Sequence, residues 1–241
     1  MLDGKISKQE SYSLYIQRAR LNVEGGQYDD ALQDLDKASE LGLKEPLLFE
    51  YGNIAAAKAE PEKAIDLYTR FIGFKGHFPQ AYQARARVYA SLNEFDQAIA
   101  DFKRSFEIQK SPHPGLFIEA SELFLKSEQP NSQAALDLLD QGMETLGVQG
   151  QLQEKAIEIE LSQGHNDVAI TRLRSLGAER KFNPSWRIDL AELLMKSGKP
   201  DEARKELDRA LNDLGTKKRN GFAEKLIARI DAMRDALDAK L

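Results

Sequence analysis

The sequence predicts an all-α fold, an α-solenoid of stacked helix pairs, and two observations support that prediction. No segment shows the alternating apolar and polar pattern of a strand. A fixed period of 33 to 37 residues is present, which is typical of solenoids, where each repeat buries its apolar face only against its neighbours. The period is marked by six alanines, each of which opens an amphipathic run: Ala31, Ala64, Ala98, Ala135, Ala169 and Ala203.

Prolines and glycines mark the helix boundaries that this period implies. Proline suits the first turn of a helix, because its missing N–H has no intrahelical partner there. The prolines placed to open a helix are Pro46, Pro61, Pro79, Pro114, Pro130, Pro184 and Pro200. The expected helix pairs, in order, are residues 8–24 and 28–41, 46–59 and 61–74, 79–92 and 95–109, 114–127 and 131–146, 150–163 and 166–177, and 184–197 and 200–215.

A thirteenth helix is expected over residues 219–239. One of its faces is apolar and the other is charged, which is typical of a terminal helix that shields the last repeat from water. We therefore predict a single solenoid domain over residues 1–241. Its repeats are expected at roughly 12–44, 45–77, 79–112, 114–148, 150–182 and 184–216.

Small residues recur where the two helices of each pair would cross. Helices approach closely only where side chains are small. The second helix contributes the alanines named above, so we expect a close contact, the seam, in every pair. The fifth repeat departs from the pattern, with Ile157 in place of a small residue. The first helices of the other repeats contribute Ala19, Gly52, Ala86, Ser121 and Ala191.

Two repeats carry a resemblance to a known family. The third contains Tyr82, Ala86, Tyr89, Phe95, Ala98 and Phe102, and the sixth contains Trp186, Ala191, Leu194, Gly198, Ala203, Leu207 and Ala210. This pattern resembles the tetratricopeptide repeat (TPR), a helix–turn–helix unit of 34 residues. The resemblance covers about residues 12–215 and implies a right-handed superhelix of six repeats. The fourth repeat is longer around Asn131 and Ser132, so the fourth and fifth are expected to be the least regular.

In the TPR family, the first helices of successive repeats line a concave groove that holds peptides or partner helices. The resemblance implies two series of groove residues, one helical turn apart and both on the side away from the seam. The first series is Arg20, Asn53, Arg87, Glu122, Glu158 and Glu192. The second series is Ile16, Phe49, Gln83, Ile118, Glu154 and Ile188.

The first groove series changes from basic to acidic along the chain. We therefore expect an extended partner to place an acidic segment on the first three repeats and a basic segment on the last three. Such charge complementarity mainly sets orientation and association rate. The alternative interpretation is that these residues are ordinary solvated charges.

Two arginine–aspartate pairs have the same spacing. Arg18 and Asp34, like Arg85 and Asp101, are 16 residues apart at equivalent places in the first and third repeats. We expect ion pairs that bridge the two helices of each repeat, worth about 0.2–1 kcal/mol each if partly exposed. The alternative is a pair of arginines that face a ligand.

Composition and motifs argue against catalysis, cofactors and nucleic-acid binding. The net charge of −5 gives no basic stripe, and the short run Lys217–Arg219 is interpreted as the solvated start of the last helix. The sequence has no cysteine, and its histidines, His77, His113 and His165, are far apart in expected loops. No metal site is predicted from them. A nucleophile elbow, a Walker-type loop and a dinucleotide fingerprint are absent, so we expect no enzyme and no cofactor.

These observations predict a non-catalytic scaffold for protein–protein interaction that binds a peptide or partner helix in the groove. Two alternatives stay open. The chain could be a regulatory or assembly module from a larger enzyme or secretion complex. It could also be a self-associating structural protein, because open solenoid ends can stack, although nothing else in the sequence indicates a homo-oligomer.

The expected location is soluble, without membrane insertion. The chain lacks a stretch of about 20 apolar residues, and its first residues lack the apolar core of a signal peptide. Because a chain that had lost its leader would look the same, the compartment stays open between the cytoplasm and the periplasm or export. The order of repeats is similar to that of bacterial TPR proteins exported from the cytosol.

Overall fold

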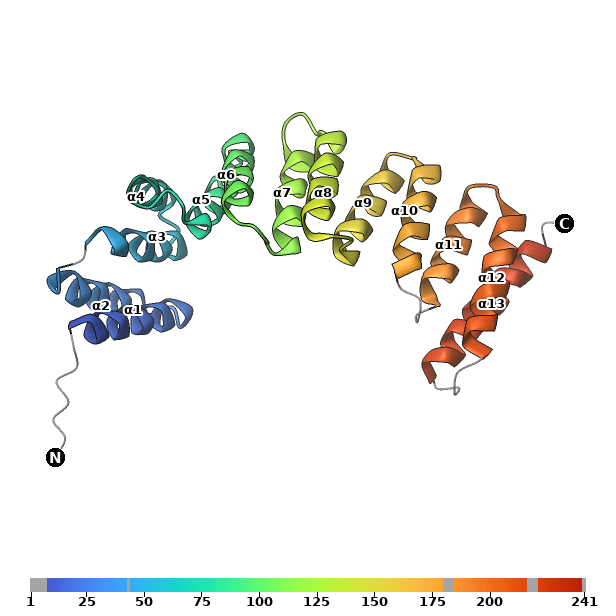
Figure 1. The fold of residues 1–241 in the computed structure, drawn as a ribbon, viewed down its shortest axis with the longest axis horizontal. Coiled ribbons are helices and arrows are strands. Elements are labelled where there is room, and N and C mark those ends of the chain that lie inside the picture. The colour runs from blue at the N-terminus through green and yellow to red at the C-terminus, as the bar shows by residue number, and fades with distance from the viewer. Residues whose placement is uncertain (1–7, 43, 180–183, 216–220, 240–241) are drawn as a thin grey trace. The chain divides into compact units, whose positions relative to one another are not determined.

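A computed structural model describes residues 8–42, 44–179, 184–215 and 221–239. Every regular element in these residues is helical: thirteen α-helices and one short 3-10 helix. The chain divides into two compact units, residues 1–131 and 132–241, and each is a stack of helices joined by short turns (Figure 1). The predicted class, an all-α solenoid, is confirmed.

Unit 1 contains three helix pairs and one further helix. The first helix of each pair packs against its own second helix, and each second helix packs against the next first helix. The elements are α1 (Lys8–Glu24), α2 (Tyr28–Glu40), the 3-10 helix η1 (Glu45–Leu47), α3 (Leu48–Ala57), α4 (Pro61–Phe74), α5 (Pro79–Ser91), α6 (Phe95–Ile108) and α7 (Pro114–Lys126).

Unit 2 begins with a single helix, continues with two pairs and ends with α13, which packs on both α11 and α12. The boundary between the units falls at Asn131 and Ser132, where the sequence showed the longer fourth repeat. The elements are α8 (Ser132–Leu146), α9 (Gly150–Ser162), α10 (Asn166–Glu179), α11 (Ser185–Lys196), α12 (Pro200–Gly215) and α13 (Gly221–Asp238).

The helix bounds agree with the predicted ones to within two residues, and four of the prolines open helices as expected: Pro61, Pro79, Pro114 and Pro200. Three others differ. Pro46 lies in η1, Pro130 precedes the first residue of α8 by two positions, and Pro184 caps α11. The predicted start of the last helix at 219 and the basic run Lys217–Arg219 lie outside the described residues.

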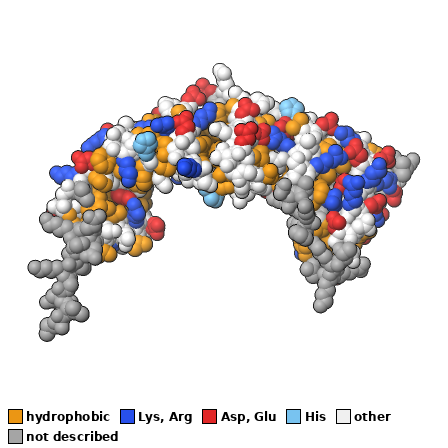
Figure 2. Space-filling model, in the orientation of Figure 1, with side chains coloured by type: hydrophobic (Ala, Val, Ile, Leu, Met, Phe, Trp, Pro, Cys, Tyr) orange, Lys and Arg blue, Asp and Glu red, His pale blue; other side chains and the backbone are white. Residues whose placement is uncertain are grey.

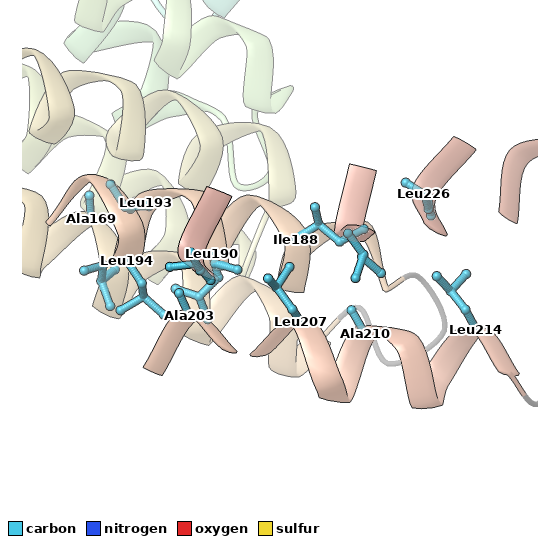
Figure 3. Close-up of a cluster of buried hydrophobic side chains, with 14 of the residues drawn as sticks. Ala169, Ile188, Leu190, Leu193, Leu194, Ala203, Leu207, Ala210, Leu214 and Leu226 are labelled. Carbon is cyan, nitrogen blue, oxygen red and sulfur yellow. The ribbon is translucent and has the colours of Figure 1, made fainter. Parts of the chain in front are cut away.

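The seam is present in the hairpins α1–α2, α3–α4, α5–α6 and α11–α12. The six alanines that mark the period are all fully buried. On α3 the seam residue is Gly52, where an added Cβ would come within 2.6 Å of the Tyr68 ring. In unit 2, Ala203 lies beside Leu190 and Leu194 (Figure 3). Each fully buried leucine contributes about 1.5–3 kcal/mol, and the small seam residues let the helices approach closely enough to bury it.

The surface carries charges of both signs. Figure 2 shows basic and acidic side chains intermixed over the visible face of both units. In the part of the chain that the structure describes, no helix combines the length and apolar character needed to cross a bilayer.

Both predicted arginine–aspartate pairs form. Arg18 donates from Nε to Asp34 at 2.7 Å, with a second bond from Nη2, and Arg85 donates from Nε and Nη2 to Asp101 at 2.8 and 2.7 Å. The two carboxylates are only 2% and 6% exposed. A hydrogen bond to a buried charged group contributes more than a surface ion pair does. These pairs therefore belong to the structural framework of their helix hairpins.

The free energy of unfolding should depend on the charge of Asp34. The hydrogen bond from Arg18, together with the positive charge of the arginine, lowers the pKa of Asp34 below its ordinary 3.8. A lowered folded-state pKa stabilises the fold above the ordinary value, and the contribution disappears as the pH falls through the folded-state pKa. We expect Asp34→Asn to reduce the free energy of unfolding by about 1–2 kcal/mol at pH 7. The loss should shrink below pH 4.

Urea unfolding at pH 7, 5, 4 and 3 measures this dependence. Asp66→Asn is the matched control, because Asp66 is 63% exposed in a 3.4 Å pair with Arg70. The control should change stability by less than about 0.5 kcal/mol. A loss in Asp34→Asn that is constant between pH 7 and pH 3 would show that the carboxylate charge contributes nothing.

Candidate partner-binding pockets

The residues predicted to line the groove are carried by the first helices. They are Ile16 and Arg20 on α1, Phe49 and Asn53 on α3, Gln83 and Arg87 on α5, Ile118 and Glu122 on α7, Glu154 and Glu158 on α9, and Ile188 and Glu192 on α11.

The second predicted series contains an error. Ile188 lies three residues before the seam residue Ala191, and residues three apart share a helix face. The side chain of Ile188 is fully buried in the core of unit 2 (Figure 3), so it is a core residue that a partner does not reach. Gln83 has the same relation to Ala86, is 8% exposed, and donates its amide to Gln109 at 3.2 Å.

Phe49, the predicted apolar anchor, is half-buried and packs within unit 1. Its ring centroid lies 5.8 Å from that of Tyr68, 5.4 Å from Phe71 and 5.2 Å from Phe78. Tilted and edge-on pairs at these distances are favourable for aromatic rings. The ring therefore joins α3 to α4 and to the start of α5. Ile16 and Ile118 are half-buried as well.

Arg20 and Asn53 meet at a pocket of about 250 Å³ in unit 1. Between them lies Glu50, a carboxylate that is 6% exposed. Arg20 donates to Glu50 from Nε at 3.1 Å and also from Nη2, and Asn53 donates to its other oxygen at 3.2 Å. Tyr68 completes the network by donating to Asn53 at 2.9 Å. The hydrogen bond that Arg20 donates to Glu50 raises the pKa of Arg20, and the carboxylate balances its charge.

Arg87 has a similar arrangement. It donates from Nε and Nη2 to Glu119 on α7 at 2.8 and 2.9 Å. The two predicted basic groove residues of unit 1 are thus each held by a first-helix carboxylate of a neighbouring repeat. Glu50 and Glu119 were not among the predicted groove residues. The comparison of positions within one repeat does not reveal pairs that are 30 and 32 residues apart.

The larger pocket lies in unit 2, where α9, α10 and α11 enclose about 510 Å³. Its size is within the range of ligand pockets in proteins. The apolar part of the lining is Ile157, Leu161, Leu173, Leu176, Trp186 and Leu193. The polar part is Glu154, Asn166, Ser185, Asp189, Glu192 and Lys196.

The carboxylates of this pocket are held by basic residues around it. Arg229 of α13 donates to Asp189 at 2.8 Å and to Glu192 at 2.6 Å. Lys196 donates to Glu192 at 2.9 Å. The hydrogen bond from Lys196, followed by that from Arg229, lowers the pKa of Glu192 and so favours its ionised form. Three acidic side chains, with Glu154 as the third, and Lys196 thus line the pocket beside its apolar residues, while Arg229 holds two of the carboxylates from α13.

Two local features of the sequence shape this pocket. Gly177 on α10 has no side chain, and the Trp186 ring occupies that space, since an added Cβ would lie 2.2 Å from the ring. Arg187 lies over the same ring at 4.3 Å from its centroid, within the range of a cation–π contact. Ile157, the residue that departs from the small-residue pattern, supplies part of the pocket wall. Trp186 and Gly177 were not predicted as site residues.

The remaining acidic members of the first series are paired along their own helices. Lys155 donates to both oxygens of Glu158 at 3.2 and 3.3 Å. Lys126 lies 3.9 Å from Glu122. Neither carboxylate lines the pocket of unit 2. Within the described ranges, no group of three or more acidic or histidine side chains is placed to hold a metal ion.

The geometry defines the class of protein. Stacked helix hairpins with small-residue seams form an all-α solenoid of the helix–turn–helix repeat type. Family models described as tetratricopeptide repeat match residues 16–82, 79–112 and 160–216, which together cover more than half of the chain. This chain belongs to the TPR family.

Solved structures of other proteins share this fold. The C-terminal part of a TPR repeat-containing protein from Cytophaga hutchinsonii is 15% identical, with 92% of this chain and 88% of that chain covered and a TM-score of 0.63. PilF of Pseudomonas aeruginosa is 14% identical over 84% and 92% of the two chains, with a TM-score of 0.57. A TPR protein of Parabacteroides merdae is 16% identical over 95% and 93%, with a TM-score of 0.55.

One curated relative matches a short segment. The UDP-N-acetylglucosamine–peptide N-acetylglucosaminyltransferase of Giardia intestinalis is 37% identical over 60 residues. The match covers 25% of this chain and 4% of that enzyme.

Proposed function

We propose that this chain is a non-catalytic scaffold that holds a short segment of a partner protein in the pocket of unit 2. Its general role as a protein-interaction scaffold follows from its TPR repeats. The observation that carries the more specific proposal is the 510 Å³ pocket, which is lined by six apolar residues and three carboxylates. Apolar pockets with a few convergent polar groups are the usual form of a binding site.

The chemistry of the lining indicates which segments fit. Leu161 and Trp186 offer apolar surface, and Leu161 is 40% exposed although it is a leucine. The charged side chains that line the pocket are three carboxylates, Glu154, Asp189 and Glu192, and one lysine, Lys196, so the lining carries a net negative charge. We infer a partner segment with one or two large apolar side chains flanked by lysine or arginine. A complex of this kind has an expected dissociation constant in the micromolar range, about −8 kcal/mol, which added salt weakens.

Leu161→Glu should disrupt this binding. The variant loses the apolar contact of the leucine with the partner, worth about 1.5–3 kcal/mol. The introduced carboxylate would also lie among apolar side chains, which is unfavourable for a charge. We expect affinity for a basic–apolar peptide to fall by at least about tenfold. Trp186 is the one tryptophan of the chain and lines the pocket, so its fluorescence reports binding of a tryptophan-free peptide directly. Peptides are first selected from a displayed library against the wild type.

Val168→Glu is the matched control. Val168 is 46% exposed, lies in the same unit and does not line this pocket. The control should bind the selected peptides within about twofold of the wild type. Equal loss in both variants, or selected peptides that leave Trp186 fluorescence unchanged, would remove the pocket of unit 2 as the site.

We also propose that the predicted groove residues of unit 1 form a second, weaker contact region for the partner. A partner carboxylate reaches Arg20 or Arg87 only by competing with Glu50 or Glu119. Substituting Arg20 or Arg87 by glutamate would place two carboxylates side by side. Such a variant would change the stability of unit 1 as well as its binding. Substitutions at exposed apolar positions in unit 2 avoid that ambiguity.

A further inference from the structure

In the second, third and fifth repeats, the same two positions of the first helix are buried. Counted from the seam residue, they lie five residues before and two residues after it, seven apart and on one face of the helix. Leu47 and Ile54 cluster with buried residues of α2, and Val88 clusters with buried residues of α4, the second helices of the preceding repeats. In three of the repeats the pairs are Leu47 and Ile54, Ala81 and Val88, and Leu152 and Ile159, and all six are at most 7% exposed.

Helix α1 carries the same pair. Counted from Ala19, the positions are Leu14 and Leu21, which lie about 10.5 Å apart along the helix. They are 53% and 65% exposed. Exposed leucines are ordinary when isolated. This pair, however, occupies the two positions that are apolar and buried between successive repeats further along the chain. Among the described residues it has no covering helix.

The last helix of unit 2, α13, exposes mostly charged or small side chains. The outward face of α13 presents Lys225, Ala228 and Asp235, all exposed, while Leu226 and Ile230 are buried against the repeats; one apolar side chain of its first turn, Phe222, is 58% exposed. A polar outer face is what a terminal helix needs for solubility. The outer face of α1 lacks that property at its two leucine positions.

In the second and third repeats, a hydrogen bond to the preceding second helix accompanies the apolar contact. Tyr51 donates to Asp36 at 2.8 Å, and Nη1 of Arg85 donates to Thr69 at 2.8 Å. Asp36 and Thr69 hold the same place on their second helices, 33 residues apart. The residue of α1 equivalent to Tyr51 and Arg85 is Arg18.

Arg18 matches Arg85 in its own repeat as well. Each uses Nε and Nη2 for an aspartate of its own second helix. In Arg85 the remaining nitrogen, Nη1, reaches the preceding helix. The side chain of Arg18 is 58% exposed, so its Nη1 is the corresponding donor for a helix laid on α1.

We propose that the outer face of α1 docks an amphipathic helix of a partner protein in the place of a preceding second helix. The apolar stripe of that helix covers Leu14 and Leu21, and a carboxylate or hydroxyl accepts from Arg18. A second copy of this chain fits less well. An antiparallel α1–α1 contact that pairs Leu14 with Leu21 brings Arg18 of both copies to the symmetry axis, where two like charges face each other.

Helix α2 is itself an amphipathic helix of the kind proposed for the partner, because it covers Leu47 and Ile54 and carries the acceptor Asp36. A peptide with its sequence can therefore serve as the probe. A lactam-stapled, fluorescein-labelled peptide of residues 27–42 is titrated with the full chain and followed by fluorescence anisotropy. We expect saturable binding. In the double variant Leu14→Gln/Leu21→Gln the affinity should fall at least about tenfold, as the loss of two leucine contacts implies.

Two comparisons make the assignment specific. The peptide with Asp36→Lys should bind several-fold more weakly, because its lysine would face Arg18. The protein variant Leu161→Gln removes an exposed leucine from the pocket of unit 2 and should bind the peptide as the wild type does, so failure here is separable from failure of the proposed pocket. Circular dichroism checks that the double variant is folded, as expected for two exposed positions.

Three results would overturn the proposal. The first is the absence of saturable binding to the wild type. The second is equal binding by the wild type and the Leu14→Gln/Leu21→Gln variant. The third is a concentration-dependent dimer of the wild type, measured by analytical ultracentrifugation, that the double variant loses, since that result would assign the face to a second copy.

Discussion

Replacing Phe102 by alanine is expected to lower the free energy of unfolding of unit 1 by about 3–5 kcal/mol, the cost of a large cavity in a packed core. The ring is fully buried on α6. It stacks at 6.3 Å on Phe106, which stacks at 4.2 Å on Phe117 of α7. Loss of the first ring therefore removes its own burial and the support for a stack that joins two repeats. Urea unfolding followed by circular dichroism measures the effect.

Phe74→Ala is the control for this substitution. The chemical change is identical, but Phe74 is 54% exposed at the end of α4. We expect a loss below about 1 kcal/mol there, as for other surface substitutions. Losses of similar size at the two positions would mean that Phe102 is not enclosed as the structure places it.

Gly177→Ala is expected to destabilise unit 2 by about 1–3 kcal/mol, although alanine is the better helix former by about 1 kcal/mol. The added Cβ would lie 2.2–2.4 Å from three atoms of the Trp186 ring, so the ring must move. Because Trp186 is the one tryptophan of the chain and lines the pocket, its emission spectrum should shift in the variant. Affinity for the peptides selected against the pocket should fall as well.

Gly73→Ala separates the clash from the effect of helix propensity. Gly73 lies on α4, and an added Cβ there has no other atom within 4 Å. This variant should be as stable as the wild type or more stable by up to about 1 kcal/mol. Stabilisation of similar size in Gly177→Ala, with an unchanged emission spectrum, would show that the ring does not pack on α10.

Much of the fold could be predicted from the sequence because the features that build one hairpin are local. The alanine period predicted the seams of the hairpins α1–α2, α3–α4, α5–α6 and α11–α12, and all six alanines are fully buried. The spacing of 16 residues between Arg18 and Asp34 predicted their ion pair, because it relates two helices joined by a short turn. The helix bounds followed from prolines and turn residues for the same reason.

The candidate site could be predicted only in part. Glu192 was predicted on the groove and does line the larger pocket, but its partner Arg229 is 37 residues away on the terminal helix. Ile188 was assigned to the groove and is buried, because its place relative to the seam residue Ala191 directs it into the core. The pocket itself depends on Trp186 lying against Gly177, a pair that no period in the sequence indicates.

By itself the sequence determined the helical class, the repeat length, the seams and the pairs within a hairpin, since these follow from the 3.6-residue turn and from contacts close along the chain. Only the tertiary structure decided which charges are already paired, such as Arg20 with Glu50, and which apolar residues stay exposed, such as Leu14. The reason is geometric. Contacts between repeats depend on how neighbouring helices are rotated and how closely they approach, and single-repeat patterns do not contain that information.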